Sequence, residues 1–281
     1  MFQYAAGRAL ADHLRTELLL DTRAFNHVLA LDAYTRRSYA LAPFKLRAEL
    51  ATPEDLKHWP RWVVDIGMRL RPARPLFRRW HFESAITYDA GVLALRDPVC
   101  LVGYWQSERY FSAIADDIRA DFTLRAPLAD DNARLLTHAR ASNSVGVHVR
   151  RGDFVSLNDA AQAHGVCSLD YYRHAIGLVR ERCPDARFLV FSDDPQWARA
   201  ELPLDSTTVF VTGNAECPEQ DLALMSACTH HIIANSSFSW WAGWLGHNTE
   251  QIVIAPRPWY AGPKLDARDL EVARWHYISR V

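Results

Sequence analysis

A basic dipeptide follows a run of alternating valines near the middle of the chain. In residues 145–154, "VGVHVRRGDF", His148 and Arg150 fall on one face of an extended segment, and Arg151 begins the loop that follows. The planar guanidinium of arginine makes paired hydrogen bonds to a phosphate group and keeps its charge at physiological pH. These residues predict contact with a phosphorylated ligand.

A second set of donors lies in the segment "ANSSFSWW", residues 234–241. Asn235, Ser236 and Ser237 stand where a predicted strand passes into a predicted helix. The exposed amides and the positive dipole end of such a helix attract anions, and serine hydroxyls add donors. Two donor sets on neighbouring strand ends would suit a pyrophosphate.

Polar residues follow the other predicted strands in the same way. In a parallel sheet, ligands bind at the carboxyl ends of the strands. The residues that follow the predicted strands are His148, Arg150, Arg151 and Asp153; Ser192, Asp193 and Asp194; Thr212, Gly213 and Asn214; and Asn235, Ser236 and Ser237. This clustering is the main argument that the second half of the chain holds a ligand.

Each of these residues also has an ordinary structural interpretation. The two arginines could be a surface pair neutralised by a nearby acid such as Asp153. Asp193 and Asp194 could cap the helix that follows them, and Asp221 could favour the dipole of its own helix. Trp240 and Trp244, four residues apart, are more typical of a core than of a sugar-binding surface.

The elements that would position these residues alternate regularly from about residue 126. Five predicted strands are separated by four predicted helices, the pattern of a doubly wound parallel α/β sheet. The strands are 144–153, 187–194, 207–213, 230–237 and 250–256; the helices are 168–184, 195–202, 218–228 and 238–246. Ser168 is expected to cap the first of these helices.

The first half is less regular. Residues 2–14 predict a helix, 17–22 a short strand, and 99–111 a strand that runs into a polar and aromatic loop. Residues 52–80 are rich in Pro, Trp and Arg, with six arginines between Arg61 and Arg79. We interpret those arginines as a solvated face; peripheral contact with a membrane-held, lipid-linked acceptor is the alternative.

Composition excludes several classes of protein. The 281 residues are 49% hydrophobic and 23% charged with a net charge of −1, so nothing in the overall charge favours nucleic acid. No apolar run approaches the roughly 18 residues of a membrane span, and no secretory signal begins the chain. The five cysteines form no Cys-x-x-Cys pair, which fits reduced thiols in the cytoplasm.

Common fingerprints for nucleotides and metals are missing as well. No Gly-x-Gly-x-x-Gly follows a predicted strand, no P-loop sequence occurs, and His230 and His231 are too close in sequence to share one ion. A leaving diphosphate would therefore be neutralised by arginine and a helix terminus, without a metal or another cofactor.

These motifs together carry a family resemblance. "MFQYAAGRALA", "GYWQSERYF", "VGVHVRRGDF", "FSDD" and "DLALMSACTHHIIANSSFSWWAGWLG" resemble, in order and spacing, the bacterial α-1,2-fucosyltransferases of glycosyltransferase family 11. The resemblance implies a GT-B fold of two Rossmann-like domains with parallel sheets: an acceptor-side domain, 1–125, and a nucleotide-sugar domain, 126–281. It also implies GDP-L-fucose as co-substrate, inversion at the fucose anomeric carbon, no metal and a terminal galactose as acceptor, for example in an O-antigen.

The resemblance also implies roles for individual residues. It makes Arg150 the contact for the donor pyrophosphate, Arg151 its support, and His148 and Asp221 the contacts for guanosine. Ser236 and Ser237 would bind phosphate, and the Ser192–Asp194 segment would lie beside the nucleoside. Asn235 joins this donor set by its place at the strand end.

The general base is the most open assignment. Asp153 and His164 are the first candidates, and the leaving phosphate could itself accept the proton. Family members carry a first strand and a Gly-Leu-Gly-Asn-Gln loop before "MFQYA"; this chain begins at that Met, so we expect the N-terminal first strand to be missing. A truncated, non-catalytic relative that binds GDP or a glycan is therefore the alternative hypothesis.

Overall fold

The computed structural model describes residues 1–26, 38–69, 77–152, 165–262 and 266–281. Contacts divide the chain into two compact units. The first comprises Met1–Thr123 and Asp266–Val272, and the second Leu124–Leu265 and Ala273–Val281. Each unit is described below on its own. The acceptor-side and donor-side roles given to residues 1–125 and 126–281 stay predictions.

The second unit is built on a six-stranded sheet in which every neighbouring pair is parallel. Its strands are β5 (Ser144–Val149), β6 (Arg187–Ser192), β7 (Val209–Val211), β8 (His230–Ile232), β9 (Val253–Arg257) and β10 (His276–Ser279). Their spatial order is β10-β9-β8-β5-β6-β7. The chain thus runs outward from β5 in one direction and from β8 in the other, so the topology switches between β5 and β8.

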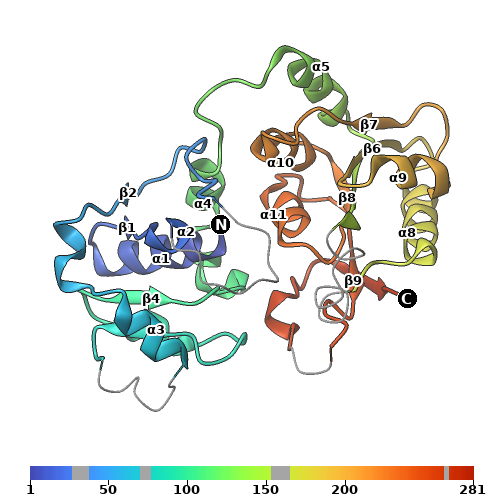
Figure 1. Ribbon diagram of the computed structural model, residues 1–281. Helices are drawn as coiled ribbons and strands as arrows, with labels where there is room; N and C mark the ends of the chain where they lie inside the picture. Colours follow the sequence, from blue (N-terminus) through green and yellow to red (C-terminus); the bar gives the residue numbers. More distant parts are fainter. Residues whose placement is uncertain (27–37, 70–76, 153–164, 263–265) are drawn as a thin grey trace. The chain divides into compact units, whose positions relative to one another are not determined.

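Helices cover both faces of this sheet. Figure 1 shows α8 and α9 on one face and α10 and α11 on the other. The helices of this unit are α5 (Asp130–Ala139), α8 (Leu169–Arg182), α9 (Pro195–Glu201), α10 (Pro218–Ser226) and α11 (Ser237–Leu245). The predicted α/β architecture with a parallel sheet is confirmed, and Ser168 caps α8 by accepting a hydrogen bond from the Tyr171 amide.

Two elements of this unit were not predicted. Strand β10 has only four residues, of which none is fully buried, so it lacks the apolar run of a central strand. Helix α5 begins at Asp130 without a side-chain cap and buries only two of its residues. Both are held by packing rather than by a local signal.

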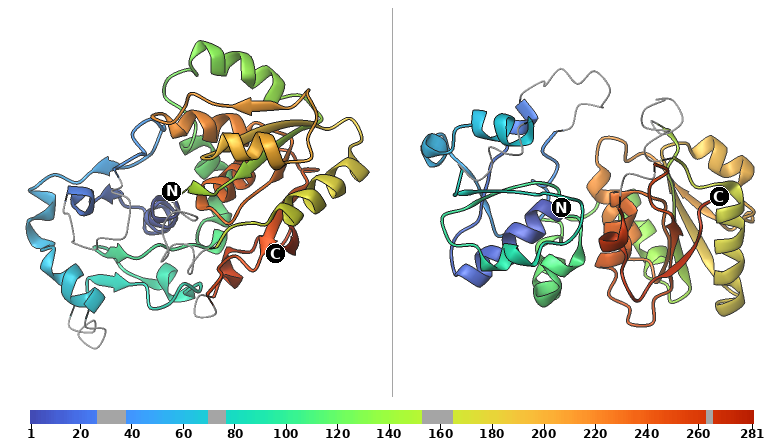
Figure 2. Two further views of the ribbon diagram at one scale, coloured as in Figure 1. Left: turned by 45° about the vertical axis from the view of Figure 1, so that its right-hand side comes forward. Right: turned by 90° about the horizontal axis from the view of Figure 1, so that it is seen from below.

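The first unit has smaller sheets. Its strands form two parallel pairs, β1 (Leu19–Leu20) with β2 (Glu49–Leu50), and β3 (Trp80–Phe82) with β4 (Cys100–Val102). Its helices are α1 (Phe2–Leu14), α2 (Arg23–Asn26), α3 (Trp62–Arg69) and α4 (Ala115–Asp121), with short 3-10 turns η1 (Asp55–His58), η3 (Ala90–Ala94), η4 (Glu108–Tyr110), η5 (Ser112–Ile114) and η6 (Arg268–Leu270). Figure 2 gives two further views of these elements.

Helix α1 is the most buried element of the first unit. Apolar residues along it are enclosed, and the Tyr4 hydroxyl donates to the buried carboxylate of Asp121, 2.6 Å away. Burial and that carboxylate raise the pKa of Tyr4 above its ordinary value. Among the described residues of the whole chain, no helix combines the length and the apolar character that crossing a membrane requires.

The tryptophans of α11 belong to the core. Trp240 and Trp244 are 0% and 1% exposed, and their rings stack with centroids 6.3 Å apart. Trp275, from the end of the chain, packs against Trp240 at 5.5 Å. The prediction of a core role for this pair is confirmed, because neither ring is exposed to bind a ligand.

Trp240→Ala should therefore lower the free energy of unfolding by about 3–5 kcal/mol, because it leaves a large cavity in the core. Urea titration followed by circular dichroism measures the change. Trp62→Ala is the control: Trp62 is 55% exposed, and its loss should cost less than about 1 kcal/mol. Equal losses in the two variants would contradict the packing described here.

Candidate functional site

Strand β5 delivers its basic residues at the switch point of the sheet. All six residues of the strand are buried between β6 and β8, and the chain reaches the surface only at Arg150 and Arg151. Because neighbouring strands are parallel, Ser192–Asp194 after β6 and Asn235–Ser237 after β8 emerge at the same edge. This edge is the ligand position of doubly wound sheets.

The arginines are held by acids from the neighbouring strand. The Arg150 guanidinium lies 3.0 Å from the Asp193 carboxylate, whose other oxygen accepts a hydrogen bond from the Arg151 amide at 2.8 Å. Arg151 lies 3.5 Å from Asp194 and 4.0 Å above the Trp197 ring. The predicted pairing of the arginines with nearby acids is therefore present, with Asp193 and Asp194 as the acids among the described residues; a pairing with Asp153 stays a prediction, because Asp153 lies outside them.

Gly152 is explained by the same contact. A Cβ atom at this position would lie 2.7 Å from Asp193 Oδ2, so a side chain here would require the Asp193 carboxylate to move. The backbone after the two arginines therefore passes directly against the carboxylate that holds Arg150. Asp194 also caps α9, accepting from the Trp197 amide at 3.1 Å, and its own amide donates to the Ser192 hydroxyl.

His148 is the last buried polar residue before this edge. Its side chain is almost fully enclosed, its ring centroid is 5.0 Å from that of Phe238, and its Nδ1 has no hydrogen-bond partner among the described residues. Burial and the positive charge of Arg150 lower the pKa of His148 to about 3. The ring is therefore neutral at pH 7 and can accept a hydrogen bond.

Phe238 is the second residue of α11, so its contact with His148 ties the end of β5 to the beginning of that helix. Ser236 is partly exposed and Ser237 exposed, and neither hydroxyl makes a hydrogen bond within the part of the chain that the structure describes. Helix α11 is nine residues long, so its first amides present the donors and the dipole of a helix N-terminus.

Asn235 serves a different purpose. Its side-chain amide donates to the carbonyls of Gly165 and Trp259, at 3.0 and 3.2 Å, and its oxygen accepts from the Cys167 thiol. The Asn235 side chain therefore links the segments at Gly165 and Trp259, which are far apart in the sequence. A contact from Asn235 to a donor stays a prediction, and the bonds observed are structural.

Asp221 lies in the first turn of α10, within a network of amides. Asn214, after β7, donates to one carboxylate oxygen at 2.6 Å, and Asn132 of α5 exchanges hydrogen bonds with Asn214. Burial raises the pKa of Asp221, while the bond from Asn214 opposes that rise. The other carboxylate oxygen makes no hydrogen bond to the described residues and could accept from a ligand.

Some residues at this edge gave no signal in the sequence. Tyr172 of α8 donates its hydroxyl to the His148 carbonyl at 3.1 Å, and Trp197 lies under Arg151. Trp197 follows Asp194 by three residues, the spacing at which a capping side chain accepts from a backbone amide. That spacing predicts the bond to the Trp197 amide but not the contact of its ring with Arg151. Asp153 and His164, the candidate bases, lie outside the described residues.

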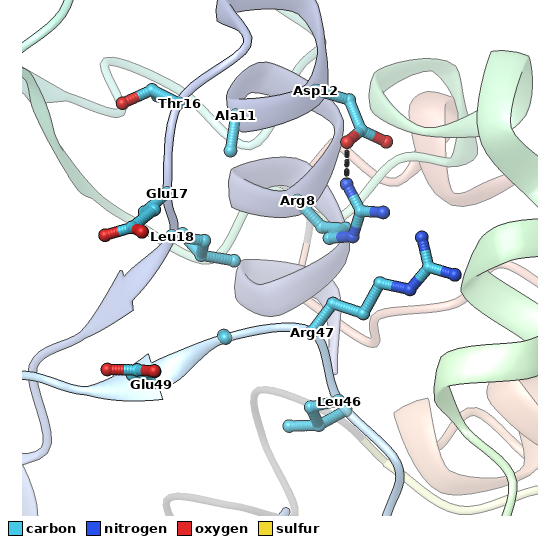
Figure 3. Close-up of a pocket in the computed structure, with 10 residues that line it drawn as sticks. Arg8, Ala11, Asp12, Thr16, Glu17, Leu18, Leu46, Arg47 and Glu49 are labelled. Atoms are coloured by element: carbon cyan, nitrogen blue, oxygen red, sulfur yellow. Dashed lines mark ion pairs between the residues drawn. The ribbon is translucent and has the colours of Figure 1, made fainter.

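A cavity of about 460 Å³ lies elsewhere, within the first unit. Figure 3 shows Arg8 of α1 paired with Asp12, and Arg47 reaching toward the same side. The cavity is lined by Arg8, Ala11, Asp12, Thr16, Glu17, Leu18, Leu46, Arg47, Ala48 and Glu49. The lining has three acids and two arginines, a balance that does not favour binding of an anion. None of the residues predicted to bind the nucleotide sugar lines this cavity.

Nor do the described residues suggest a metal. Among them, no three His, Cys, Asp or Glu side chains gather as a metal site would require. Among the described residues that follow β5 and β6, the charged side chains are those of Arg150, Arg151, Asp193 and Asp194.

Replacing His148 by Phe should make folding less sensitive to acid. The pKa of His148 is about 3 in the folded chain and 6.5 ordinarily. Between these two pH values, His148 is therefore protonated in the unfolded chain and neutral in the folded chain. The stability that neutral His148 contributes is present above pH 6.5 and is lost as the pH falls toward 3.

Urea titrations between about pH 7 and pH 4 measure this effect, and His148→Phe should lose less stability over that range than the wild type. The control is His174→Phe, on the exposed face of α8, which should follow the wild type. If both variants keep the wild-type dependence on pH, His148 is not held neutral by burial.

Comparison with known proteins shows the family of the chain. The model of "Glycosyl transferase family 11" matches residues 91–279. Alpha-1,2-colitosyltransferase of Escherichia coli is 33% identical over 286 residues, covering 100% of this chain and 95% of the relative.

Two further relatives extend the comparison. The O-antigen biosynthesis glycosyltransferase WbnK of Escherichia coli is 30% identical, over 93% of this chain and 91% of that protein. Galactoside alpha-(1,2)-fucosyltransferase 1 of Bos taurus is 31% identical over 161 residues, which are 54% of this chain and 45% of the relative. With a family match over most of its length and a relative aligned over all of it, the chain belongs to glycosyltransferase family 11.

Proposed function

We propose that the chain is an inverting, metal-independent transferase that moves L-fucose from GDP-β-L-fucose to the 2-hydroxyl of a terminal galactose on a glycan. The observation that supports this most is the topology of the sheet: Arg150 follows β5 and the N-terminus of α11 follows β8, and these neighbouring parallel strands end at the same edge, where His148 contacts Phe238. A cation and a set of free amides on adjacent strand ends offer a diphosphate charge neutralisation from two sides.

The proposal assigns the chemistry as follows. The bond between the fucose anomeric carbon and the β-phosphate oxygen breaks, and GDP leaves with the bonding electrons. The galactose 2-hydroxyl oxygen forms the new bond from the opposite face and gives up its proton to a base. Arg150 and the α11 amides stabilise the negative charge that grows on the departing diphosphate.

The Asp193 carboxylate prepares Arg150 for this task. In the structure it neutralises the guanidinium and, through the Arg151 amide and the close approach of Gly152, fixes where that guanidinium lies. A diphosphate would share or replace this carboxylate as the partner of Arg150. Asp153 and His164 remain the candidates for the base, with the leaving phosphate as the third.

Selection of guanine is assigned to Asp221. Guanine presents two adjacent N–H donors on its Watson–Crick edge, and uracil presents one between two carbonyls. A carboxylate that Asn214 holds by one oxygen can use its other oxygen to accept from those donors. His148 is neutral, and its Nδ1 has no hydrogen-bond partner within the described ranges, so it would add an acceptor near the nucleoside.

The family of the chain leaves two donor sugars to compare. One relative is named for colitose, the 3-deoxy form of L-fucose, and another for fucose. The acceptor proposal rests on the relative named for galactosides and on the one named for O-antigen biosynthesis. The proposal also includes the GT-B arrangement, with the donor bound by residues 126–281 and the acceptor by residues 1–125.

Turnover assays with GDP-fucose and with GDP-colitose, each with a galactoside acceptor, test the function itself. The proposal expects the fucosylated product with inverted configuration. Transfer from GDP-colitose alone would correct the sugar and keep the enzyme class. Binding of GDP without transfer of either sugar would favour the non-catalytic alternative.

Arg150→Ala should weaken GDP binding by about 2–3 kcal/mol, or about 30- to 160-fold, because a charged hydrogen bond to the diphosphate is lost. Isothermal titration calorimetry measures the affinity. Arg187→Ala is the matched control, since Arg187 is exposed at the opposite end of β6 and should alter binding by less than about 0.5 kcal/mol. Unchanged GDP affinity in Arg150→Ala would remove the phosphate role.

Asp221→Asn should weaken binding of GDP by about tenfold or more and leave the weak affinity for UDP nearly unchanged. The reason is that the amide N–H group of Asn is a donor and cannot accept a hydrogen bond from the N–H groups of guanine. Glu219→Gln is the control, because it removes an acid from the same first turn of α10. Equal losses for GDP and UDP would show that Asp221 does not select the base.

A further inference from the structure

In the first unit, the carboxyl ends of the parallel strands β3 and β4 lie at one edge of their two-stranded sheet. The two strands are parallel, so Glu83 after β3 and the Gly103–Tyr104 segment after β4 emerge side by side. Strand ends of this kind are where α/β units place ligand contacts. The donor chemistry described above uses none of these residues.

The loop after β4 is fixed in place before any ligand arrives. The two oxygens of Glu83 accept hydrogen bonds from the Tyr104 and Trp105 amides, both at 2.8 Å. The Gln3 side chain of α1 donates to the Gly103 carbonyl at 2.7 Å. A Cβ at Gly103 would lie 2.4 Å from the Cβ of Glu83, so the chains approach this closely only at a glycine.

Trp105 adds backbone strain to this loop. Its φ is 57°, in the left-handed region that residues other than glycine rarely adopt, and its side chain is 1% exposed. Strain of this kind persists where surrounding contacts enforce it, often at binding sites. Its effect here is to turn the chain so that Trp105 is buried while its neighbour Tyr104 is 67% exposed.

His81 contacts the same loop through the buried ring of Trp105. His81 of β3 stacks on Trp105 with centroids 5.7 Å apart, and its Nε2 lies 3.0 Å from the Asp89 carboxylate. Asp89 is itself fixed, because its other oxygen accepts from the Gly91 amide and its own amide donates to the Tyr110 hydroxyl.

The Asp89 carboxylate accepts from His81 Nε2, and when the ring is neutral this leaves His81 Nδ1 to accept a hydrogen bond. No hydrogen bond within the described part of the chain uses that Nδ1. The His81 side chain is 26% exposed, so a ligand hydroxyl can reach it.

The charges at this edge select the class of ligand. Glu83 and Asp89 are both acids, and the nearby cation Arg109 is paired with Asp269 at 3.1 Å and stacks on Tyr88. A diphosphate would meet two carboxylates here and is disfavoured. A neutral pyranose fits, because its apolar face can pack on an aromatic ring while its hydroxyls donate to fixed acceptors.

We propose that the edge formed by Tyr104 and His81 binds the acceptor sugar, with the Tyr104 ring against its apolar face and His81 Nδ1 accepting a hydrogen bond from one of its hydroxyls. The inference rests on the proposed function and names the place where the neutral glycan is recognised. Asp89 and Glu83 act as positioning residues, because they hold the ring and the loop.

The first experiment measures steady-state kinetics with a galactoside at saturating donor. Tyr104→Ala and His81→Gln should each raise the acceptor KM by about tenfold or more, since each loses burial or a hydrogen bond with the sugar. Affinity for GDP should stay at the wild-type value in both. Trp62→Ala, another exposed aromatic of the same unit, is the matched control and should keep the wild-type KM.

The second experiment requires no turnover. Saturation-transfer NMR on the full chain should detect the galactoside with the wild type and with Trp62→Ala, and the signal should fall strongly with Tyr104→Ala. Equal signals in all three proteins, or a wild-type acceptor KM in both Tyr104→Ala and His81→Gln, would overturn this inference and leave the donor proposal intact. Loss of GDP binding in the wild type would instead overturn the proposed function.

Discussion

Complete burial of strand β5 is the constraint on which the grouping of polar residues at its carboxyl end depends. The strand has a neighbour on each side and a helical layer on each face, so no side chain along its six residues reaches water freely. A polar chain segment can leave such a strand only at its end. Arg150 and Arg151 therefore emerge at the switch point, beside the residues that leave β6 and β8.

Two positive charges, those of Arg150 and Arg151, lie at one strand end and are paired with two acids that follow the neighbouring strand β6. Asp193 and Asp194 neutralise the arginines, and Asp193 also accepts the Arg151 amide, so that the cation, the loop and Gly152 form one unit. An arginine held in this way loses little side-chain freedom when an anion binds. Neutralisation by a carboxylate that a diphosphate can replace is thus compatible with both a stable fold and a donor site.

Much of the second unit could be predicted because its signals are local. The valines of β5, Ser168 before α8 and Pro195 at the start of α9 each act within a few residues. The order of the strands, the partners of Asn235 and the ring beneath Arg151 could not be predicted, because they join residues far apart in the sequence. β10 was missed because its four residues lack an apolar run.

In the first unit the balance is reversed. The predicted strands at 17–22 and 99–111 contain β1 and β4, but β2 and β3 have two and three residues and too little periodicity to be recognised. The fixed loop at Gly103 and Tyr104 depends on Gln3 and Glu83, which are 100 and 21 residues away from these two residues. The sequence suggested a polar and aromatic loop after β4 but not its fixed shape. The residues proposed for the donor could therefore be predicted from the sequence, and the edge proposed for the acceptor could not.

The central claim is that a diphosphate binds at the end of β5. A crystal structure of the chain with GDP tests it most directly. The account predicts the phosphates within hydrogen-bonding distance of the Arg150 guanidinium and of the first amides of α11, with the base toward Asp221. GDP bound elsewhere, for instance in the cavity beside Arg8 and Arg47, with Arg150 still paired to Asp193, would contradict it.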